Sequence, residues 1–294
     1  HEACKILFDH ECVFCQIRSF ETLLNKHQVE EEKKDKIVKD FLTYLSGIDY
    51  HQTSPDVARE LQATIRKVIN DPDPFRNEKR KGNREMLAWY PKLQKIVENA
   101  DDKFDTALRL AIAGNIIDFG PGHQFDVMET VENVLHSDFT IDHSEKLRQA
   151  VHNAKNILYL GDNAGEIVFD KLFLETINHK EVYFAVRESP VINDALKEDA
   201  YFVGMDKIAN IITNGYDAPS TILDKSSPEF LEIFHKTDLV ISKGMGNFEG
   251  LMNCKRPNLF FLFMVKCELI ANIINANVKD FVVLSSQHRI TQSL

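Results

Sequence analysis

Oxygen-bearing side chains directly follow two short apolar runs in the second half of the sequence. Asp162 and Asn163 come after the run at 157–160, and Asp194 lies in the segment that follows the run at 182–186. Carboxylate and amide oxygens are hard donors, and no Cys or His lies at these positions, so the set favours Mg²⁺ or Mn²⁺ over zinc. Two carboxylates and one amide leave coordination positions open for water and substrate. The pattern therefore predicts a metal site suited to polarising a phosphoryl oxygen.

The adjacent pair Asp162 and Asn163 has a second interpretation. A helical spacing of apolar residues begins near Gly165, and Asp and Asn readily accept hydrogen bonds from the free N–H groups at the start of a helix. The pair would then cap this helix without binding a metal ion. The residue types alone leave capping and metal ligation open, and one side chain can serve both.

A glycine-rich segment, "KGMGNFEG" at 243–250, follows a later apolar run. Gly244 and Gly246 would let backbone N–H groups approach a ligand closely, and a helix N-terminus there would favour an anion. Lys243 and Lys266, which follow neighbouring apolar runs, would balance the charge of a phosphate. The alternative is a tight turn with surface lysines. Neither the phosphate-binding motif G-x-x-x-x-G-K-S/T nor the dinucleotide motif G-x-G-x-x-G occurs in the chain.

Two polar residues interrupt a strongly apolar helical segment, "RLAIAGNIIDFG" at 109–120. Asn115 and Asp118 stand three residues apart and so share one helix face. Buried polar groups cost free energy unless they are paired, so each of these two should have a partner. The favoured partner is a neighbouring backbone end, because buried polar side chains bond mostly to backbone or water. The alternative partner is the active-site loop of the second half.

The elements that must position these residues change character near residue 150. Up to that point apolar residues recur three and four apart between breaks that contain Pro and Gly, which predicts a helical bundle. Beyond it, short apolar runs alternate with helical segments, which is typical of a parallel sheet. The runs are "NILYL", "VYFAV", "ANIIT", "DLVIS", "NLFFLF" and "DFVVLS". Because ligands bind at the carboxyl ends of such strands, we predict a helical domain at 1–150 and a ligand-binding α/β domain at 151–294.

The composition argues against two classes of partner. The 294 residues include 35 Lys plus Arg and 45 Asp plus Glu, a formal net charge of -10, and nucleic acids favour basic surfaces. No apolar run approaches the roughly 20 residues that a membrane-spanning helix needs, and the N-terminal residues lack the apolar core of a signal peptide. We therefore expect a cytoplasmic protein that binds neither nucleic acid nor membranes. The residues do not indicate an oligomeric state.

The chain contains five cysteines, an odd number that does not indicate a disulfide framework. They are Cys4, Cys12, Cys15, Cys254 and Cys267. Cys12 and Cys15 form one C-x-x-C, whereas a structural zinc site needs four ligands. We interpret this pair as reduced thiols on one turn of a helix. In the alternative interpretation, Cys4 and His10 complete a zinc site with them.

Six segments occur in an order that resembles the damage-control phosphatase family, also known as domain of unknown function 89, with an ARMT-like metal-binding fold. The segments are "ECVFC", "RLAIAGNIIDFG", "GDNAGEIVFDKL", "SPVINDA", "SKGMGNFEG" and the lysine of "FLFMVKCELIA". The N-terminal C-x-x-C resembles the prokaryotic branch. The resemblance implies a Rossmann-like three-layer α/β/α domain after an all-helical one. It also implies a divalent-metal-dependent phosphatase, with Mg²⁺, Mn²⁺, Co²⁺ or Ni²⁺, that acts on small phosphorylated metabolites.

The resemblance also implies roles for individual residues. Those that match the family's metal ligands are Asp162, Asn163 and Asp194. Those that match its substrate contacts are Gly246, Asn247 and Lys266. The eukaryotic sugar-phosphate branch has an Arg-Thr pair before that lysine, where this chain has Phe263, Met264 and Val265. This departure argues against the sugar-phosphate substrates of that branch.

We therefore expect hydrolysis of a small phosphomonoester, with Asp162 and Lys266 as catalytic residues. Lys243, Lys266 and the backbone from Gly244 to Asn247 would balance the charge that the transition state spreads over the phosphoryl oxygens. The nucleophile is either a water on the metal or Asp162 itself. Two alternatives use the same sheet. One is an S-adenosylmethionine-dependent carboxyl methyltransferase, and the other is a non-catalytic metabolite-binding protein.

Overall fold

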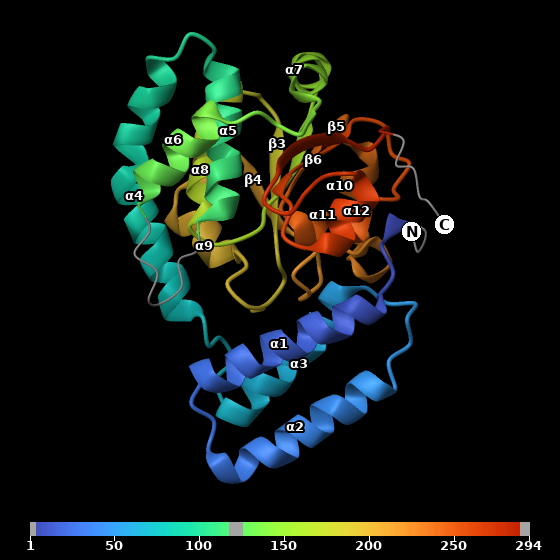
Figure 1. Cartoon of the computed structure of the whole chain (residues 1–294). Coiled ribbons are helices and arrows are strands. Elements are labelled where there is room, and N and C mark those ends of the chain that lie inside the picture. Colours follow the sequence, from blue (N-terminus) through green and yellow to red (C-terminus); the bar gives the residue numbers. More distant parts are fainter. Residues whose placement is uncertain (1–3, 118–125, 289–294) are drawn as a thin grey trace.

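The centre of the molecule is a mainly parallel sheet. The computed structural model describes residues 4–117 and 126–288, and Figure 1 shows the helices that surround the sheet. The strands are β1 (Ile141–Asp142), β2 (Ile157–Leu160), β3 (Val182–Val186), β4 (Asn210–Thr213), β5 (Leu239–Lys243), β6 (Leu259–Met264) and β7 (Phe281–Ser285). Their order is β1-β7-β6-β5-β2-β3-β4, and every neighbouring pair is parallel except β6 and β7. The predicted α/β class is confirmed, since each of the six apolar runs forms a strand.

Helices cover both faces of the sheet because its strands are apolar on both faces. Along β2, Ile157 and Tyr159 pack into one hydrophobic core, while Leu158 and Leu160 pack into another, since successive side chains of a strand point to opposite faces. The helices of the first core are α4 (Arg76–Glu98), α5 (Lys103–Ile116), α6 (Val127–His136), α7 (Ser144–Asn153), α8 (Glu166–Ile177) and α9 (Lys197–Phe202). Those of the second core are α10 (Pro228–Lys236), α11 (Met245–Leu251) and α12 (Glu268–Ile274). The result is the predicted three-layer α/β/α arrangement.

The first three helices form a hydrophobic core of their own. They are α1 (His10–Lys26), α2 (Glu31–Ser46) and α3 (Ser54–Ile69). Phe20 of α1, Phe41 of α2 and Leu61 of α3 are buried together, and Figure 1 shows these helices as a separate group beside the sheet. The sequence defines the start of α3 sharply, because Thr53 and Asp56 form a reciprocal capping box there.

Polar contacts attach α3 to the loops that follow β3 and β4. Arg66 donates to the backbone oxygen of Pro190 at 2.9 Å, and the Tyr216 hydroxyl donates to Asp56 Oδ1 at 2.8 Å. Through these contacts the N-terminal end of α3 lies at the carboxyl edge of the sheet, where ligands of parallel sheets bind.

The predicted helical character of the first half is confirmed by α1 to α6. The division into domains at 1–150 and 151–294 stays a prediction: residue 150 lies inside α7, β1 precedes it in the sheet, and α4 to α6 share a core with the sheet. The turn "FGPGHQF" and Asp118 lie outside the described residues. Within residues 4–117 and 126–288, no helix has both the length and the apolar character needed to span a membrane.

Candidate functional site

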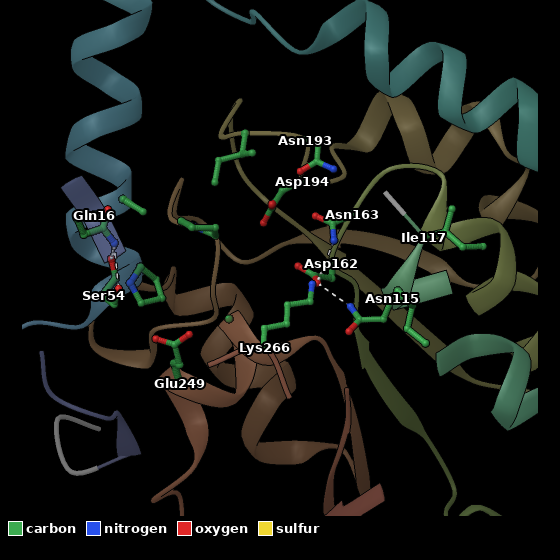
Figure 2. Close-up of a pocket in the computed structure, with 16 residues that line it drawn as sticks. Gln16, Ser54, Asn115, Ile117, Asp162, Asn163, Asn193, Asp194, Glu249 and Lys266 are labelled. Atoms are coloured by element: carbon green, nitrogen blue, oxygen red, sulfur yellow. Dashed lines mark hydrogen bonds between the residues drawn. The ribbon is translucent and has the colours of Figure 1, made fainter. Parts of the chain in front are cut away.

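The loops that follow β2 and β3 meet at the carboxyl edge of the sheet, and we call them the metal loops because they carry the predicted metal ligands. These strands are parallel neighbours, so their ends lie side by side. The loops form a single antiparallel bridge between Asn163 and Asp194. Ala195 N donates to Asp162 O at 2.9 Å, and Ala164 N donates to Asn193 O at 3.0 Å. Backbone pairing thus brings together the three predicted ligands, and Figure 2 shows their side chains around one cavity.

Arg187, the residue that follows β3, lies behind the carboxylates of Asp162 and Asp194, the two predicted ligands. Its Nε donates to Asp194 Oδ2 at 2.7 Å, and its Nη2 lies 3.6 Å from Asp162 Oδ1. The side chain is 2% exposed. A guanidinium presents several donors in a rigid plane, so it can bind two carboxylates at once and fix their separation. Arg187 had no predicted role, and its place directly after an apolar run was the available signal in the sequence.

The two carboxylates carry more negative charge than their surroundings balance. Burial raises the pKa of Asp162 well above its usual range, and Glu166 and Asp194 raise that pKa further, whereas Arg187 and Lys266 lower it. Burial also raises the pKa of Asp194, against the lowering effect of Arg187. Burial thus disfavours the charged carboxylates, and a cation placed beside them would favour the charged forms. The electrostatics of the site therefore fit a bound divalent ion.

The free oxygen atoms of the site also fit a hard metal ion. Among the described residues, Asp194 Oδ1 and Asn163 Oδ1 accept no hydrogen bond, and Asp162 Oδ1 faces Arg187 alone at 3.6 Å. No three His, Cys, Asp or Glu side chains within residues 4–117 and 126–288 are arranged to hold a metal ion. With two carboxylates present, the Asn163 amide is the third oxygen ligand available here. Such an all-oxygen set suits Mg²⁺ or Mn²⁺.

The capping alternative for Asp162 and Asn163 is not what the structure contains. Helix α8 begins at Glu166, and its N-cap is Gly165, whose φ of 76° lies in the region that favours glycine. Gly165 N donates to Asn83 Oδ1 at 2.7 Å, and Asn163 N donates to Glu166 Oε2 at 3.2 Å. The N–H groups at this turn are thus bound by Asn83 and Glu166, which leaves the Asp162 and Asn163 side chains directed at the cavity.

Asn115 bonds to the metal loop, contrary to the favoured prediction of a backbone partner. Its Nδ2 donates to Asp162 Oδ2 at 3.1 Å and to Glu166 Oε1 at 2.5 Å. Its Oδ1 accepts a longer bond from Met264 N at 3.5 Å. The prediction failed because α5 lies directly on α8, which brings the two carboxylates closer to Asn115 than any free backbone end.

Lys243 does not reach the cavity, although the sequence suggested it as a phosphate contact. It is 0% exposed, and its Nζ donates to Asp170 Oδ1 at 2.7 Å and to Ala111 O at 2.8 Å. Glu166 Oε1 lies 3.7 Å away. As the last residue of β5, Lys243 points into the layer of α5 and α8 instead of over the edge of the sheet. Its charge balances two buried carboxylates.

Asn247 is likewise placed beneath the cavity, not in it. Its Oδ1 accepts from Arg187 Nη1 at 3.1 Å and from Thr221 Oγ1 at 2.9 Å. Its Nδ2 donates to Gly161 O at 3.2 Å and to Lys243 O at 2.8 Å. These bonds use both donors and the acceptor of the amide. The side chain therefore holds Arg187 in place and has no free group for a substrate.

Close backbone contacts explain the glycines of this segment. A Cβ at Gly244 would lie 2.1 Å from Asp162 Oδ2, and Gly244 has a φ of 85°. A Cβ at Gly246 would lie 2.2 Å from the oxygen of Pro219. Gly244 thus makes room for the metal loop, while Gly246 lines the cavity as predicted.

The cavity above the metal loops has a volume of about 520 Å³. Both halves of the chain line it, since Gln16 of α1 and Ser54 of α3 lie across from the loops that follow β2 and β3. Lys266 is exposed, and Figure 2 shows its side chain extending towards Asp162. Among the described residues, the Lys266 ammonium forms no hydrogen bond or ion pair of its own. It is therefore available to an anionic ligand.

Glu249 of α11 also lines the cavity, and sequence reasoning gave it no role. Among the described residues its carboxyl group has no hydrogen-bond partner, and burial raises its pKa to about 8. The sequence signal was only its place in the glycine-rich segment. A carboxyl group with this pKa is largely neutral at pH 7.

The chain resembles known proteins in sequence and in fold. A sequence model of the damage-control phosphatase ARMT1-like domain matches residues 8–282. A damage-control phosphatase of Pyrococcus horikoshii is 39% identical over 209 residues, which cover 70% of this chain and 72% of the relative. A damage-control phosphatase of Archaeoglobus fulgidus is 32% identical over 233 residues, which cover 77% and 80%. The crystal structure of a DUF89 family protein from Pyrococcus horikoshii superposes with a TM-score of 0.87 at 30% identity, over 96% of this chain and 100% of that one.

Proposed function

Because the chain belongs to the damage-control phosphatase family with the ARMT1-like domain, we propose that it is a phosphomonoesterase whose divalent cation is held by Asp162, Asn163 and Asp194. Relatives that carry the name damage-control phosphatase support a metal-dependent phosphatase of this type and do not favour the methyltransferase alternative. The observation that carries the assignment of the site is the convergence of these three side chains on one cavity that Lys266 also lines.

Asp162 acts as a ligand in this proposal. Its Oδ2 accepts hydrogen bonds from Asn115 Nδ2 at 3.1 Å and Asn163 Nδ2 at 3.2 Å, which leaves Oδ1 for a cation. When bound, the divalent cation polarises the phosphoryl group and lowers the pKa of a neighbouring water. A carboxylate engaged by two amide donors and a cation is a poor nucleophile. We therefore assign the attack on phosphorus to water and not to Asp162.

Lys266 and the backbone at Gly246 bind the phosphoryl oxygens. The Lys266 ammonium is exposed in the cavity and extends towards the metal loop, so its charge lies where the transition state places negative charge. Gly246 lines the same cavity without a side chain that would fill it. Gln16 Nε2 donates to Ser54 Oγ at 3.0 Å, and these two side chains bound the cavity on the side of α1 and α3.

Lys243 and Asn247 position other groups and do not contact the substrate. Lys243 neutralises Asp170 and Glu166 beneath the metal loop. Asn247 holds Arg187, which in turn binds the carboxylates of Asp162 and Asp194. Substitutions of Lys243 or Asn247 therefore change the stability of the fold or the positions of Asp162 and Asp194, and they remove no contact to the substrate.

The test is phosphate release from p-nitrophenyl phosphate by the purified protein. Activity is measured after treatment with EDTA and after addition of Mg²⁺, Mn²⁺, Co²⁺ or Ni²⁺. We expect EDTA to abolish turnover and one or more ions to restore it. We also expect Asp194→Asn to weaken Mn²⁺ binding at least tenfold in isothermal titration, by about 1.4 kcal/mol or more.

The matched control is Asp206→Asn, which changes an exposed aspartate far from the cavity and should leave metal binding and turnover unaltered. Full activity in EDTA, or an Asp162→Asn variant as active as the natural protein, would contradict the proposed metal site. Tight binding of phosphate esters without repeated turnover would support the non-catalytic alternative.

A further inference from the structure

A second cavity adjoins the first and shares part of its wall. It has a volume of about 710 Å³. Ser54, Glu249 and Lys266 line both cavities, so a ligand bound at Lys266 can extend from one into the other. The second cavity lies between α1 and the chain around α12.

Sulfur atoms and hydrocarbon groups make up most of the wall of this second cavity. Cys12, Phe14 and Cys15 of α1 face Met245, Cys267 and Val278 across it, and we call these six residues the sulfur-lined chamber. All three cysteines are free thiols. Burial raises the pKa of Cys12 and Cys15, and it raises the pKa of Cys267 to about 11. These thiols are therefore uncharged near neutral pH, and thiols are weak hydrogen-bond donors and acceptors.

The chamber is therefore a poor environment for hydroxyl groups. A hydroxyl moved from water to a site without a hydrogen-bond partner loses free energy, whereas an apolar group gains by the same transfer. Charged residues of the second cavity, such as Glu11, Arg18 and Glu268, are exposed and remain hydrated. The first cavity has a more polar wall, since it adds the carboxylates of Asp162 and Asp194 and the amides of Gln16, Asn115, Asn163 and Asn193.

Resting on the proposed function, we propose that the substrate is a phosphate monoester with a largely apolar leaving group, which occupies the sulfur-lined chamber while its phosphate lies at Lys266 and the metal loops. The shared wall of Ser54, Glu249 and Lys266 places the ester oxygen at the junction of the two cavities. Polyhydroxylated phosphates of the same length are poorer substrates, because their hydroxyl groups exchange water for thiol and hydrocarbon groups in the chamber.

The test compares esters that share a phosphate and differ in the leaving group. Methyl, propyl and hexyl phosphate are measured beside a hexitol phosphate, which has the same carbon skeleton as hexyl phosphate with hydroxyl groups added. We expect kcat/KM to rise about threefold for each methylene group that enters the chamber. Hexyl phosphate should exceed the hexitol phosphate at least tenfold. Equal values for the two six-carbon esters would overturn the proposal.

A variant that fills the chamber tests the location. Cys15 is exposed on α1, so Cys15→Trp is compatible with the fold and should lower kcat/KM for hexyl phosphate about tenfold while methyl phosphate stays within twofold. Ser19→Trp places the same side chain on an exposed position of α1 outside both cavities and should change neither. An equal loss for both esters in Cys15→Trp would overturn the proposed location.

Failure of the proposed function gives a different result. If no ester is hydrolysed, methyl phosphate included, the phosphatase assignment is wrong. The affinities of the esters then test whether the chamber binds an apolar group. Isothermal titration should give tighter binding for hexyl than for methyl phosphate in the natural protein, with the difference lost in Cys15→Trp. Equal affinities for the two esters would overturn the chamber proposal.

Discussion

The Asn115 amide on α5 donates to Asp162 Oδ2 across 3.1 Å. This bond joins a helix of the first half of the chain to the loop that follows β2. The same amide group donates to Glu166 Oε1 at 2.5 Å, so one side chain orients a proposed metal ligand and satisfies a buried carboxylate.

The first prediction follows from this bond. Asn115→Ala should lower kcat/KM at least tenfold and reduce the free energy of unfolding by about 1–3 kcal/mol. The substitution removes one of the two amide donors to Asp162 Oδ2 and leaves Glu166 Oε1 without a hydrogen-bond donor. Urea denaturation and steady-state kinetics measure the two effects. Asn153→Ala on the exposed end of α7 is the control and should change neither. An Asn115→Ala variant with normal activity and stability would contradict this role.

A second prediction separates the two lysines. Lys266→Ala should lower kcat/KM about a hundredfold, by about 2.7 kcal/mol of transition-state stabilisation, with unchanged stability and no loss of Mn²⁺ affinity. Lys243→Met should instead reduce the free energy of unfolding by about 3–5 kcal/mol, because it leaves Asp170 without its buried partner. Thermal unfolding, Mn²⁺ titration and kinetics distinguish these outcomes. Lys255→Ala, an exposed lysine, is the control. Loss of stability in Lys266→Ala would contradict its assignment to substrate.

A third prediction concerns the charge balance around Arg187. Arg187→Gln should destabilise the metal-free protein by about 3–5 kcal/mol, because Asp194 loses its buried partner. Mn²⁺ should then raise the melting temperature of this variant more than that of the natural protein, since the ion supplies positive charge at the same carboxylates. Arg148→Gln, which breaks an exposed pair with Asp102, should cost less than about 1 kcal/mol and show no additional response to Mn²⁺. An equal rise with Mn²⁺ in all three proteins would contradict the charge balance assigned to Arg187, and no rise in any of them would argue against the metal site.

A fourth prediction uses the raised pKa of Glu249. In the folded state the pKa of the Glu249 carboxyl group is about 8, whereas its ordinary pKa is 4.5. A folded pKa above the unfolded one gives a stabilising contribution that is complete below pH 4.5 and lost as the pH rises through 8. Glu249→Gln keeps this position neutral. Its melting temperature should therefore exceed that of the natural protein at about pH 9 by more than it does at about pH 5.

The same substitution predicts a change in substrate binding with pH. The other charged or titratable side chains that line the two cavities are Asp162, Asp194, Lys266, Glu11, Arg18, Glu268 and the thiols of Cys12, Cys15 and Cys267. Ionised Glu249 repels a phosphate dianion, so KM of the natural protein should rise above about pH 8 and that of Glu249→Gln should rise less. Parallel pH profiles for the two proteins would contradict this account.

The sequence predicted the sheet well because buried parallel strands are continuous apolar runs. β1 was missed because it consists of Ile141 and Asp142 alone, too short for such a run. The convergence of Asp162, Asn163 and Asp194 was predictable, since carboxyl ends of neighbouring parallel strands lie together. Their roles in metal binding stay a prediction.

Side-chain direction at the ends of elements could not be predicted in the same way. Lys243 is the last residue of β5, and a shift of one position decides whether a side chain there points into a helix layer or over the edge. Glu249 owes its raised pKa to burial by segments far away in the sequence. Asn115 has its partners because α5 and α8 pack closely. These properties depend on tertiary packing, which local residue patterns do not contain.

The separate hydrophobic core of α1 to α3 has a consequence for how this architecture can diversify. These helices contribute Cys12, Cys15, Gln16 and Ser54 to the two cavities, while Phe20, Phe41 and Leu61 hold them together without the sheet. Replacements on their cavity-facing surface leave the strands and the loops that follow β2 and β3 intact. Under the proposed function, substrate preference can therefore evolve on the helices while the proposed metal site at the edge of the sheet stays unchanged.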